Sequence, residues 1–244
     1  MTVKINYAKK APNNPSGNLI LFTDEKFDIN GLKKYLSNLE FSYIKDLLKT
    51  SDLKKNLFVF ELNSKKKIVL ISVKKDLKSF DIENLGAEFY GRINYGKNSE
   101  YFVNSDSIVS KYDNFIGHFL HGLKLKSYEF NKYKTKKENR LISINIYGNK
   151  NKTSVQSQLK FKAIEEGTFY ARDLVSEPGN ILHPDEYAKR LNSLRKDGLK
   201  VSVYDEKKLK KLGMYALLGV GMGSIRGSYL VTMEWNGAKN NSKP

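Results

Sequence analysis

A stretch in the second half of the chain, ARDLVSEPGN (residues 171–180), gathers residue types that can do chemistry. Arg172, Asp173 and Glu177 could form a catalytic acid–base set, or they could be ion-pairing and capping residues at a helix end. The proline after Glu177 disfavours helix in the residue before it, and the glycine after that turns the chain easily. The stretch is therefore predicted to end a helix and to turn sharply.

Two histidines in the segment HFLH form a second candidate site. His118 and His121 stand three residues apart, a spacing that can hold a metal ion on one face of a helix. The sequence has no cysteine, and no carboxylate motif nearby supplies a third ligand. We therefore favour partly buried or surface histidines. His183, which precedes a proline, stands where the N-cap of a helix belongs.

Three glycines in GVGMGS (residues 219–224) follow an apolar run and could cradle a phosphate. The dinucleotide-binding fingerprint places its third glycine three positions after the second and continues into a helix. Here the spacing is two, and a strand is expected to follow, so a tight turn is favoured. No nucleophile-elbow motif occurs, and no serine has a histidine and an acid in recognisable context. By its own residues the chain shows no catalytic, substrate-binding or metal-ligating set.

The elements that would position such residues alternate between strands and helices over the first 150 residues. RLISINIYG is the clearest strand, because Ile142, Ile144 and Ile146 alternate with residues that face the other way. This order indicates a mixed or parallel sheet covered by helices, an α/β domain. The expected strands are 3–7, 18–22, 56–62, 67–73 and 140–148, and the expected helices are 31–49, 81–93 and 113–125.

A polar stretch at 149–156 marks a domain boundary, and a long connecting helix is predicted after it. Apolar or small residues recur there every three or four positions, from Val155 to Leu174, and the helix should stop near Ser176. A second α/β pattern follows. Its expected elements are a helix over 183–198, with Pro184 at its start and Gly198 at its end, a strand over 199–205, a short helix over 206–213, and strands over 215–224 and 228–235.

Charge and composition bound the class of protein. The 244 residues carry a formal net charge of +17, but only six of the 43 basic residues are arginine. Arginine is the preferred reader of bases and phosphates, so lysines spread along the chain indicate solvated surface rather than a nucleic-acid site. No apolar run approaches the roughly 18 residues that span a membrane. The amino terminus has no secretion signal, so we expect a cytoplasmic protein without a membrane partner.

Four motifs resemble the leucyl (cytosol) aminopeptidase family, in the family's order and spacing. They are GLKLKSYEFNKYKTKK (122–137), YARDLVSEPGNILHPDEYAKRL (170–191), MYALLGVGMGS (214–224) and YLVTMEWNG (229–237). The chain departs from the family pattern at Lys126, usually Gly, at Ser176, usually Asn, and at His183, usually Thr. Residues 1–120 resemble the family only in their pattern of elements.

The resemblance implies three parts: a macro-like amino-terminal α/β domain (1–150), a connecting helix (151–178) and the truncated beginning of a zinc-exopeptidase-like α/β domain (179–244). Enzymes of that family remove amino-terminal residues from peptides with two divalent metal ions, zinc or manganese, which activate a water and stabilise the oxyanion. They assemble as hexamers, and some bind DNA. Peptide substrates, two metal ions and a homo-oligomer are thus implied for the full-length enzyme.

The family's metal ligands lie in a Gly-Lys-Gly…Phe-Asp motif and an Asn-Thr-Asp-Ala-Glu-Gly-Arg motif. Both are expected after the strand that ends near Trp235, beyond this sequence, so no residue here inherits a ligand role. We therefore expect Arg172, Asp173 and Glu177 to be structural residues at the domain junction, and the chain alone to be metal-free and inactive. The alternatives are a basic nucleic-acid-binding module and, last, a nucleotide-ligand domain, which would lack a glycine-rich phosphate loop in 1–120.

Overall fold

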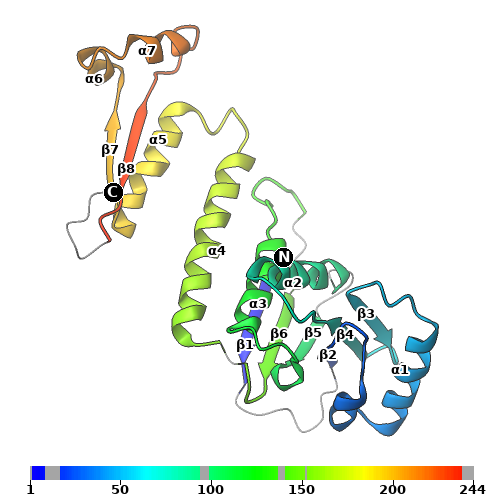
Figure 1. The fold of residues 1–244 in the computed structure, drawn as a ribbon. Helices are drawn as coiled ribbons and strands as arrows, with labels where there is room; N and C mark the ends of the chain where they lie inside the picture. Colours follow the sequence, from blue (N-terminus) through cyan, green and yellow to red (C-terminus); the bar gives the residue numbers. More distant parts are fainter. Residues whose placement is uncertain (1, 9–16, 94–98, 137–140, 152, 238–244) are drawn as a thin grey trace. The chain divides into compact units, whose positions relative to one another are not determined.

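The computed structural model describes residues 2–8, 17–93, 99–136, 141–151 and 153–237, and the chain divides into two compact units. The first unit is Met1–Ala171 and the second is Arg172–Pro244 (Figure 1).

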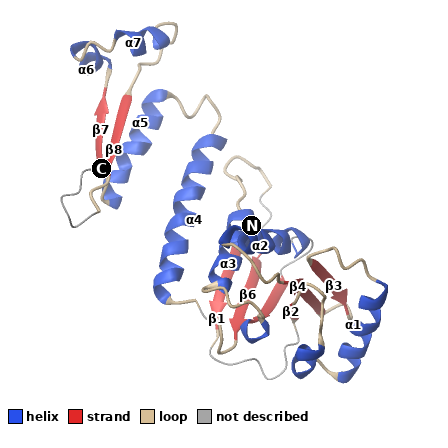
Figure 2. Ribbon diagram, viewed as in Figure 1, coloured by secondary structure: helices blue, strands red, loops and turns tan. Residues whose placement is uncertain are grey.

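The first unit is built on a six-stranded sheet with the order β1-β6-β5-β2-β4-β3 (Figure 2). Neighbouring strands run parallel except β3, which is antiparallel to β4. The predicted α/β sheet is confirmed, but its central strand β5 was not predicted. The strands are β1 (Thr2–Tyr7), β2 (Asn18–Thr23), β3 (Leu57–Glu61), β4 (Lys67–Ser72), β5 (Ser99–Asn104) and β6 (Leu141–Tyr147).

Helices cover both faces of this sheet. On one face, α2 (Ser79–Ile93) and α3 (Phe115–Lys126) bury a cluster that includes Phe22 and the three isoleucines of β6. On the other face, α1 (Asn38–Thr50) closes a second cluster that includes Leu21 of β2. Parallel strands that are covered on both faces have continuous apolar sequences. This explains why all residues of β2 and β4 after the first are buried.

The helices α2 and α3 approach each other closely because each has a glycine at the crossing. A Cβ on Gly86 would collide with the backbone carbonyl of Phe119, and a Cβ on Gly122 with that of Glu83. Any larger residue would force the helices apart, so these two glycines set the position of α3.

The helix predicted over 31–49 is broken in two. A short 3-10 helix (Asn30–Tyr35) ends, and α1 begins after Ser37. The Ser37 hydroxyl accepts a hydrogen bond from the Glu40 amide at 3.2 Å, while the Glu40 carboxylate accepts one from the Ser37 amide at 2.9 Å. This reciprocal capping box starts a new helix inside the predicted one.

The long helix α4 spans Val155–Ser176, as predicted, but the repeat that predicted it lies on its exposed side. None of its 22 residues is fully buried, and Val155 and Leu159 are exposed. Phe161 and Glu165 instead contact the histidines of α3. No helix in the described parts of the chain is long and apolar enough to cross a membrane.

The second unit packs α5 against a two-stranded antiparallel sheet. Its buried apolar side chains, within residues 172–237, are Ala188, Leu191, Val201 and Leu209. A 3-10 turn (Ser193–Asp197) follows α5 and ends at Gly198, whose φ of 93° is the left-handed conformation that favours glycine. The elements are α5 (Pro184–Asn192), β7 (Lys200–Tyr204), α6 (Glu206–Lys211), α7 (Tyr215–Gly221) and β8 (Leu230–Glu234).

The strand predicted over 215–224 is wrong, because the segment forms the helix α7. Ala216, Leu217 and Leu218 are strong helix formers, and the Leu218 amide donates to the Met214 carbonyl at 3.3 Å. A short apolar run does not distinguish a strand from a helix by periodicity. The described part of this unit thus has two strands, not three.

Candidate functional site

Glu177, in the opening charged stretch, is held by an arginine of the next helix. Its carboxylate is 1% exposed and accepts a hydrogen bond from Arg190 Nη1 at 2.8 Å. Arg190 Nε also donates to Glu186 at 2.9 Å. Hydrogen bonds to Glu177 and then Glu186 raise the pKa of Arg190 above its usual range, and the bond from Arg190 lowers the pKa of Glu186. The ion pair of this buried carboxylate with Arg190 connects the end of α4 to α5.

Arg172 and Asp173 lie in the last turn of α4, Arg172 half-buried and Asp173 exposed. The Asp173 carbonyl accepts a hydrogen bond from the Glu177 amide at 3.1 Å, which continues the helical pattern to the turn. The structure locates an ion-pair partner for Glu177. That partner is Arg190, thirteen residues later, which the sequence interpretation did not include.

His183 occupies the N-cap position of α5, as predicted, although its side chain makes no capping hydrogen bond. Pro184 takes the first turn of the helix, where its missing amide hydrogen costs nothing. The preceding turn is closed by the Ile181 and Leu182 amides, which both donate to the Pro178 carbonyl. The local sequence thus fixes how the chain leaves α4 and enters α5.

His118 and His121 do not converge on one site. His118 Nδ1 lies 2.8 Å from Glu83 Oε1, whereas His121 Nδ1 lies 2.9 Å from Glu165 Oε1. Both imidazoles contact the ring of Phe161, with centroid separations of 5.0 and 4.9 Å. Each histidine therefore ties α3 to a different helix. Among the described residues, no group of three or more potential ligand side chains could hold a metal ion.

The glycines of residues 219–224 do not form a phosphate cradle. Gly219 and Gly221 lie in α7, and their carbonyls accept hydrogen bonds from the amides of Met222 and Ser224. Those amides are therefore committed to the helix end and are not directed at a ligand.

Polar residues gather at the carboxyl ends of β5 and β6, the edge at which open α/β sheets commonly bind ligands. Here they hold the chain to itself. Ser107 Oγ accepts from the Phe22 amide and donates to the Asn104 carbonyl, while Asp106 Oδ1 accepts from the amides of Asn149 and Lys150. These contacts join the loops after β5 and β6. Ser107 and Asp106 therefore bind other parts of the chain, and their arrangement does not support the nucleotide-ligand alternative.

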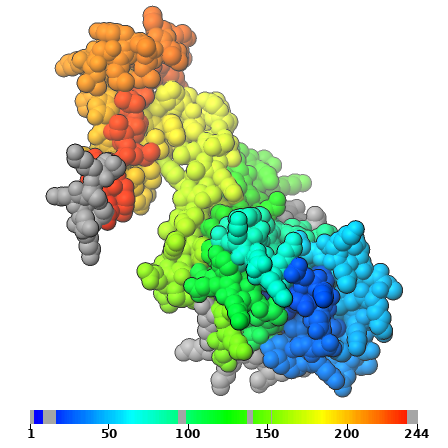
Figure 3. All heavy atoms as spheres, in the orientation of Figure 1, coloured from blue at the N-terminus to red at the C-terminus, as the bar shows by residue number. Residues whose placement is uncertain are grey.

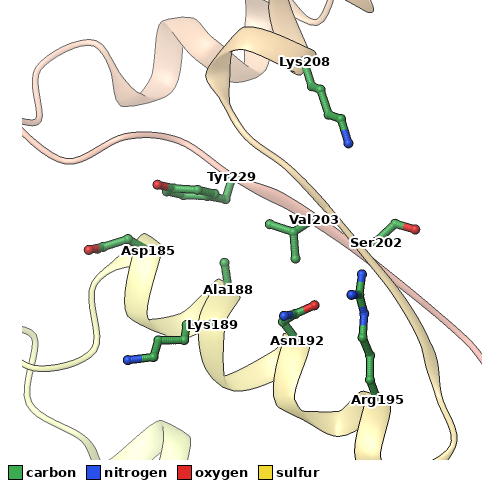
Figure 4. A pocket seen from close by; sticks show the side chains of 9 residues that line it. All are labelled: Asp185, Ala188, Lys189, Asn192, Arg195, Ser202, Val203, Lys208 and Tyr229. Carbon is green, nitrogen blue, oxygen red and sulfur yellow. The ribbon is translucent and has the colours of Figure 1, made fainter.

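A hollow of about 500 Å³ lies in the second unit between α5, β7 and α6 (Figure 4). Its charged side chains are engaged locally: Arg195 donates to the Val201 carbonyl, and Lys208 lies over the Tyr204 ring at 5.4 Å. Its lining combines one acid with three bases and does not contain a nucleophile beside a base. The lining residues are Asp185, Ala188, Lys189, Asn192, Arg195, Ser202, Val203, Lys208 and Tyr229.

Comparison with known proteins gives a family match in the second unit. The family described as cytosol aminopeptidase family, catalytic domain, matches residues 169–244. A probable cytosol aminopeptidase from Brucella anthropi is 44% identical over 130 residues, covering 50% of this chain and 26% of the relative. One from Nitrobacter winogradskyi is 35% identical over 191 residues, covering 73% of this chain and 37% of the relative. The chain thus spans well under two thirds of the length of these relatives.

Solved structures share the fold at low sequence identity. A tomato leucine aminopeptidase mutant superimposes with a TM-score of 0.70 at 16% identity, covering 95% of this chain and 50% of that one. A bottromycin maturation enzyme in complex with Mn gives 0.65 at 14%, covering 89% and 45%. A cytosol aminopeptidase from Coxiella burnetii gives 0.65 at 17%, covering 94% and 46%. The α/β architecture is therefore that of aminopeptidases.

Proposed function

This chain belongs to the cytosol aminopeptidase family, and from that membership we propose that it supplies the amino-terminal part of a metal-dependent leucyl aminopeptidase. The reaction is the removal of amino-terminal residues from peptides. The observation that carries this proposal is the match of residues 169–244 to the family's catalytic domain. The relative that is 35% identical over 191 residues supports extending it into the first unit.

We assign the parts of the chain accordingly. Residues 1–150 form a macro-like domain, 151–178 a connecting helix and 179–244 the beginning of the catalytic domain. The six-stranded sheet of the first unit and the continuous helix α4 support this division. Glu177 and Arg190 then have a structural role, because their ion pair fixes the start of the catalytic part.

Two divalent metal ions, zinc or manganese, would supply water activation and charge stabilisation in such a reaction. The described residues of this chain do not fit them, since no group of three or more ligand side chains comes together. We therefore assign no metal ligand and no catalytic residue to this chain.

The family name supports a cytoplasmic location and peptide substrates as proposals. From the family resemblance alone we also propose that the full-length enzyme is a hexamer. The matches offer no support for the nucleic-acid-binding alternative.

A chimera tests the proposed function. In it, residues 1–244 of this chain replace the matched amino-terminal part of the Nitrobacter winogradskyi relative, and hydrolysis of a leucyl anilide is measured with added manganese. We expect chelator-sensitive hydrolysis that the relative's remaining carboxy-terminal part alone does not give. A folded, metal-loaded chimera that releases no product would contradict the proposal.

A further inference from the structure

A hollow of about 260 Å³ lies in the first unit, and we call it the α3–α4 hollow. It is bounded by Ile5 and Tyr7 of β1, by one face of α3, and by Thr153 with the first half of α4 (Figure 1). The atoms of α4, coloured yellow-green in Figure 3, are at the surface of the molecule. Tyr7 and Lys162 line the hollow and have exposed side chains, so it opens to solvent. Sites for drug-sized ligands measure roughly 300–1,000 Å³, so this hollow suits a smaller molecule.

One wall of the α3–α4 hollow carries a carboxylate of fixed orientation. The Glu165 side chain is 13% exposed, and its Oε1 lies 2.9 Å from His121 Nδ1. An ionised carboxylate only accepts hydrogen bonds, so Nδ1 donates this one and orients the acid. The bond uses Oε1, and Oε2 is able to accept another. A carboxylate in this position, beside the Phe161 ring, suits the ammonium group of a ligand.

The lining also includes a buried hydroxyl that has no hydrogen-bond partner. Thr153 is 6% exposed, and its Oγ1 makes no hydrogen bond within the described part of the chain. Burial raises the pKa of Tyr7, and the nearby Thr153 hydroxyl opposes that rise in part. The two side chains are thus neighbours, but their geometry is not that of a hydrogen bond. A buried hydroxyl without a partner costs free energy, which a ligand that bonds to it recovers.

The charges along α4 favour a ligand that carries both signs. Lys162 lines the hollow and makes only a long ion pair with Glu166, at 3.7 Å, in which both side chains are 69% exposed. The amino-terminal end of α4, next to Thr153, favours negative charge because of the helix dipole. Glu165 lies further along the helix and favours positive charge. A carboxylate near Thr153 and Lys162, with an ammonium group at Glu165, matches this order.

We propose that the α3–α4 hollow binds a free amino acid with a branched apolar side chain. The ammonium group donates to Glu165 Oε2, and the carboxylate accepts from the Thr153 hydroxyl and lies near Lys162. The side chain of the ligand contacts Ile5 and Leu120, which belong to the apolar packing on this face of the sheet. The site does not depend on the proposed function, although the proposed reaction releases amino acids of this class.

The test titrates the full chain with leucine and measures binding by ligand-detected NMR and calorimetry. Three analogues each lack one group: N-acetylleucine lacks the ammonium, isopentylamine the carboxylate and glycine the side chain. The test variants are Glu165→Gln and Thr153→Val. The matched control is Glu83→Gln, which removes the charge of the glutamate that pairs with His118 and does not line the hollow.

We expect leucine to bind one-to-one and each analogue to bind about tenfold or more weakly, because each loses a charge-assisted hydrogen bond or the apolar contact. Both test variants should weaken leucine binding by about tenfold or more, and the control should leave it unchanged. Thr153→Val should also retain the wild-type resistance to urea, because it removes a hydroxyl that has no partner in the described structure.

A folded chain that binds no leucine would overturn the proposal, and so would leucine binding that both test variants leave unchanged. Equal binding of isopentylamine would identify an amine site, and equal binding of N-acetylleucine an anion site; either result would overturn the assignment of an amino acid. A loss of stability in Thr153→Val would reveal an internal partner for the hydroxyl and remove it from the site. None of these measurements involves hydrolysis, so a failure of this proposal is distinguishable from a failure of the proposed function.

Discussion

The two units bury very different amounts of apolar surface. In the first, two clusters fill both faces of the six-stranded sheet, and residues such as Phe22, Phe89 and Phe119 are fully buried. In the described part of the second, four apolar side chains are buried. The second unit relies instead on the Glu177–Arg190 ion pair and on helix caps such as Asp205, whose carboxylate accepts from the Lys208 amide at 2.9 Å.

This difference indicates where each unit gets its stability. Burying a large apolar side chain stabilises a fold by about 1.5–3 kcal/mol, so a packed sheet can stand on its own core. A buried ion pair adds little net stability but is costly to break. The first unit therefore has a large apolar core of its own, whereas the described part of the second unit has a small one.

The largest effect is expected in the core of the first unit. Phe22 makes edge-on contacts with Phe115 and Phe119, at centroid separations of 5.4 and 5.5 Å. Phe22→Ala should lower the free energy of unfolding by about 3–5 kcal/mol, because it removes these contacts and leaves a cavity. Urea unfolding followed by far-UV circular dichroism measures it. Phe80→Ala, at an exposed position, is the control. Equal effects of the two would contradict the assigned core.

A somewhat smaller effect is expected at the junction cluster. Glu177→Ala should destabilise the second unit by about 1.5–3 kcal/mol, because Arg190 loses one charge-assisted hydrogen bond and keeps Glu186 as its other partner. Fluorescence of Trp235, the chain's one tryptophan, reports on this unit during urea unfolding.

Asp197→Ala, at an exposed site, is the matched control, and a double-mutant cycle with Arg190→Ala isolates the coupling. We expect Arg172→Ala and Asp173→Ala to lower stability as well, and to lower intrinsic turnover of a full-length enzyme less. Normal melting with abolished turnover would instead make the cluster catalytic.

A pH-dependent effect of at most about 1 kcal/mol is expected at the start of α1, because Glu40 is only partly buried and solvent screens its ion pair with Lys66. Burial raises the pKa of Glu40, but hydrogen bonds from Lys66 and Ser37 outweigh it, and the net pKa is below its usual value of 4.5. A lowered pKa gives stability that is present above 4.5 and is lost as the pH falls through the folded-state pKa. Glu40→Gln should remove this component from urea titrations run down to about pH 3. The exposed Glu25→Gln should retain it. An unchanged pH profile in Glu40→Gln would exclude the capping box as its source.

The smallest change in stability per residue is expected at three exposed apolar side chains of the second unit. Val220→Ser, Met222→Ser and Ile225→Ser together should shift the free energy of unfolding by less than about 0.5 kcal/mol per site, because the side chains are exposed. The same variant should slow aggregation of the isolated chain, measured by light scattering. A large loss of stability would show that these side chains are packed.

The elements were predicted best where a strong apolar periodicity was followed by a residue that ends a helix. Val155–Ser176 had both a repeat and a following proline, and its bounds were predicted correctly. The strand Ser99–Asn104 was missed because its short run of mixed polarity becomes a strand only between β2 and β6. The helix Tyr215–Gly221 was predicted as a strand because a short apolar run is ambiguous.

The charged cluster was recognised from its residue types, but its geometry was not predictable. The partner of Glu177 is Arg190, and only the turn at Pro178 and the start of α5 bring the two together. The pairing of His118 and His121 with separate glutamates likewise depends on how α2 and α4 pack against α3. Such pairings follow from tertiary structure, which local sequence patterns do not specify.

The central proposal is that this chain is the amino-terminal part of a metal-dependent aminopeptidase, and that its described residues do not form the catalytic metal site. Assay of the pure chain with a leucyl anilide, in the presence of zinc or manganese and with calorimetry of metal binding, tests it most directly. We predict no stoichiometric metal binding and no product release. Chelator-sensitive hydrolysis by the pure chain would contradict the account, because it would require a metal site among these residues.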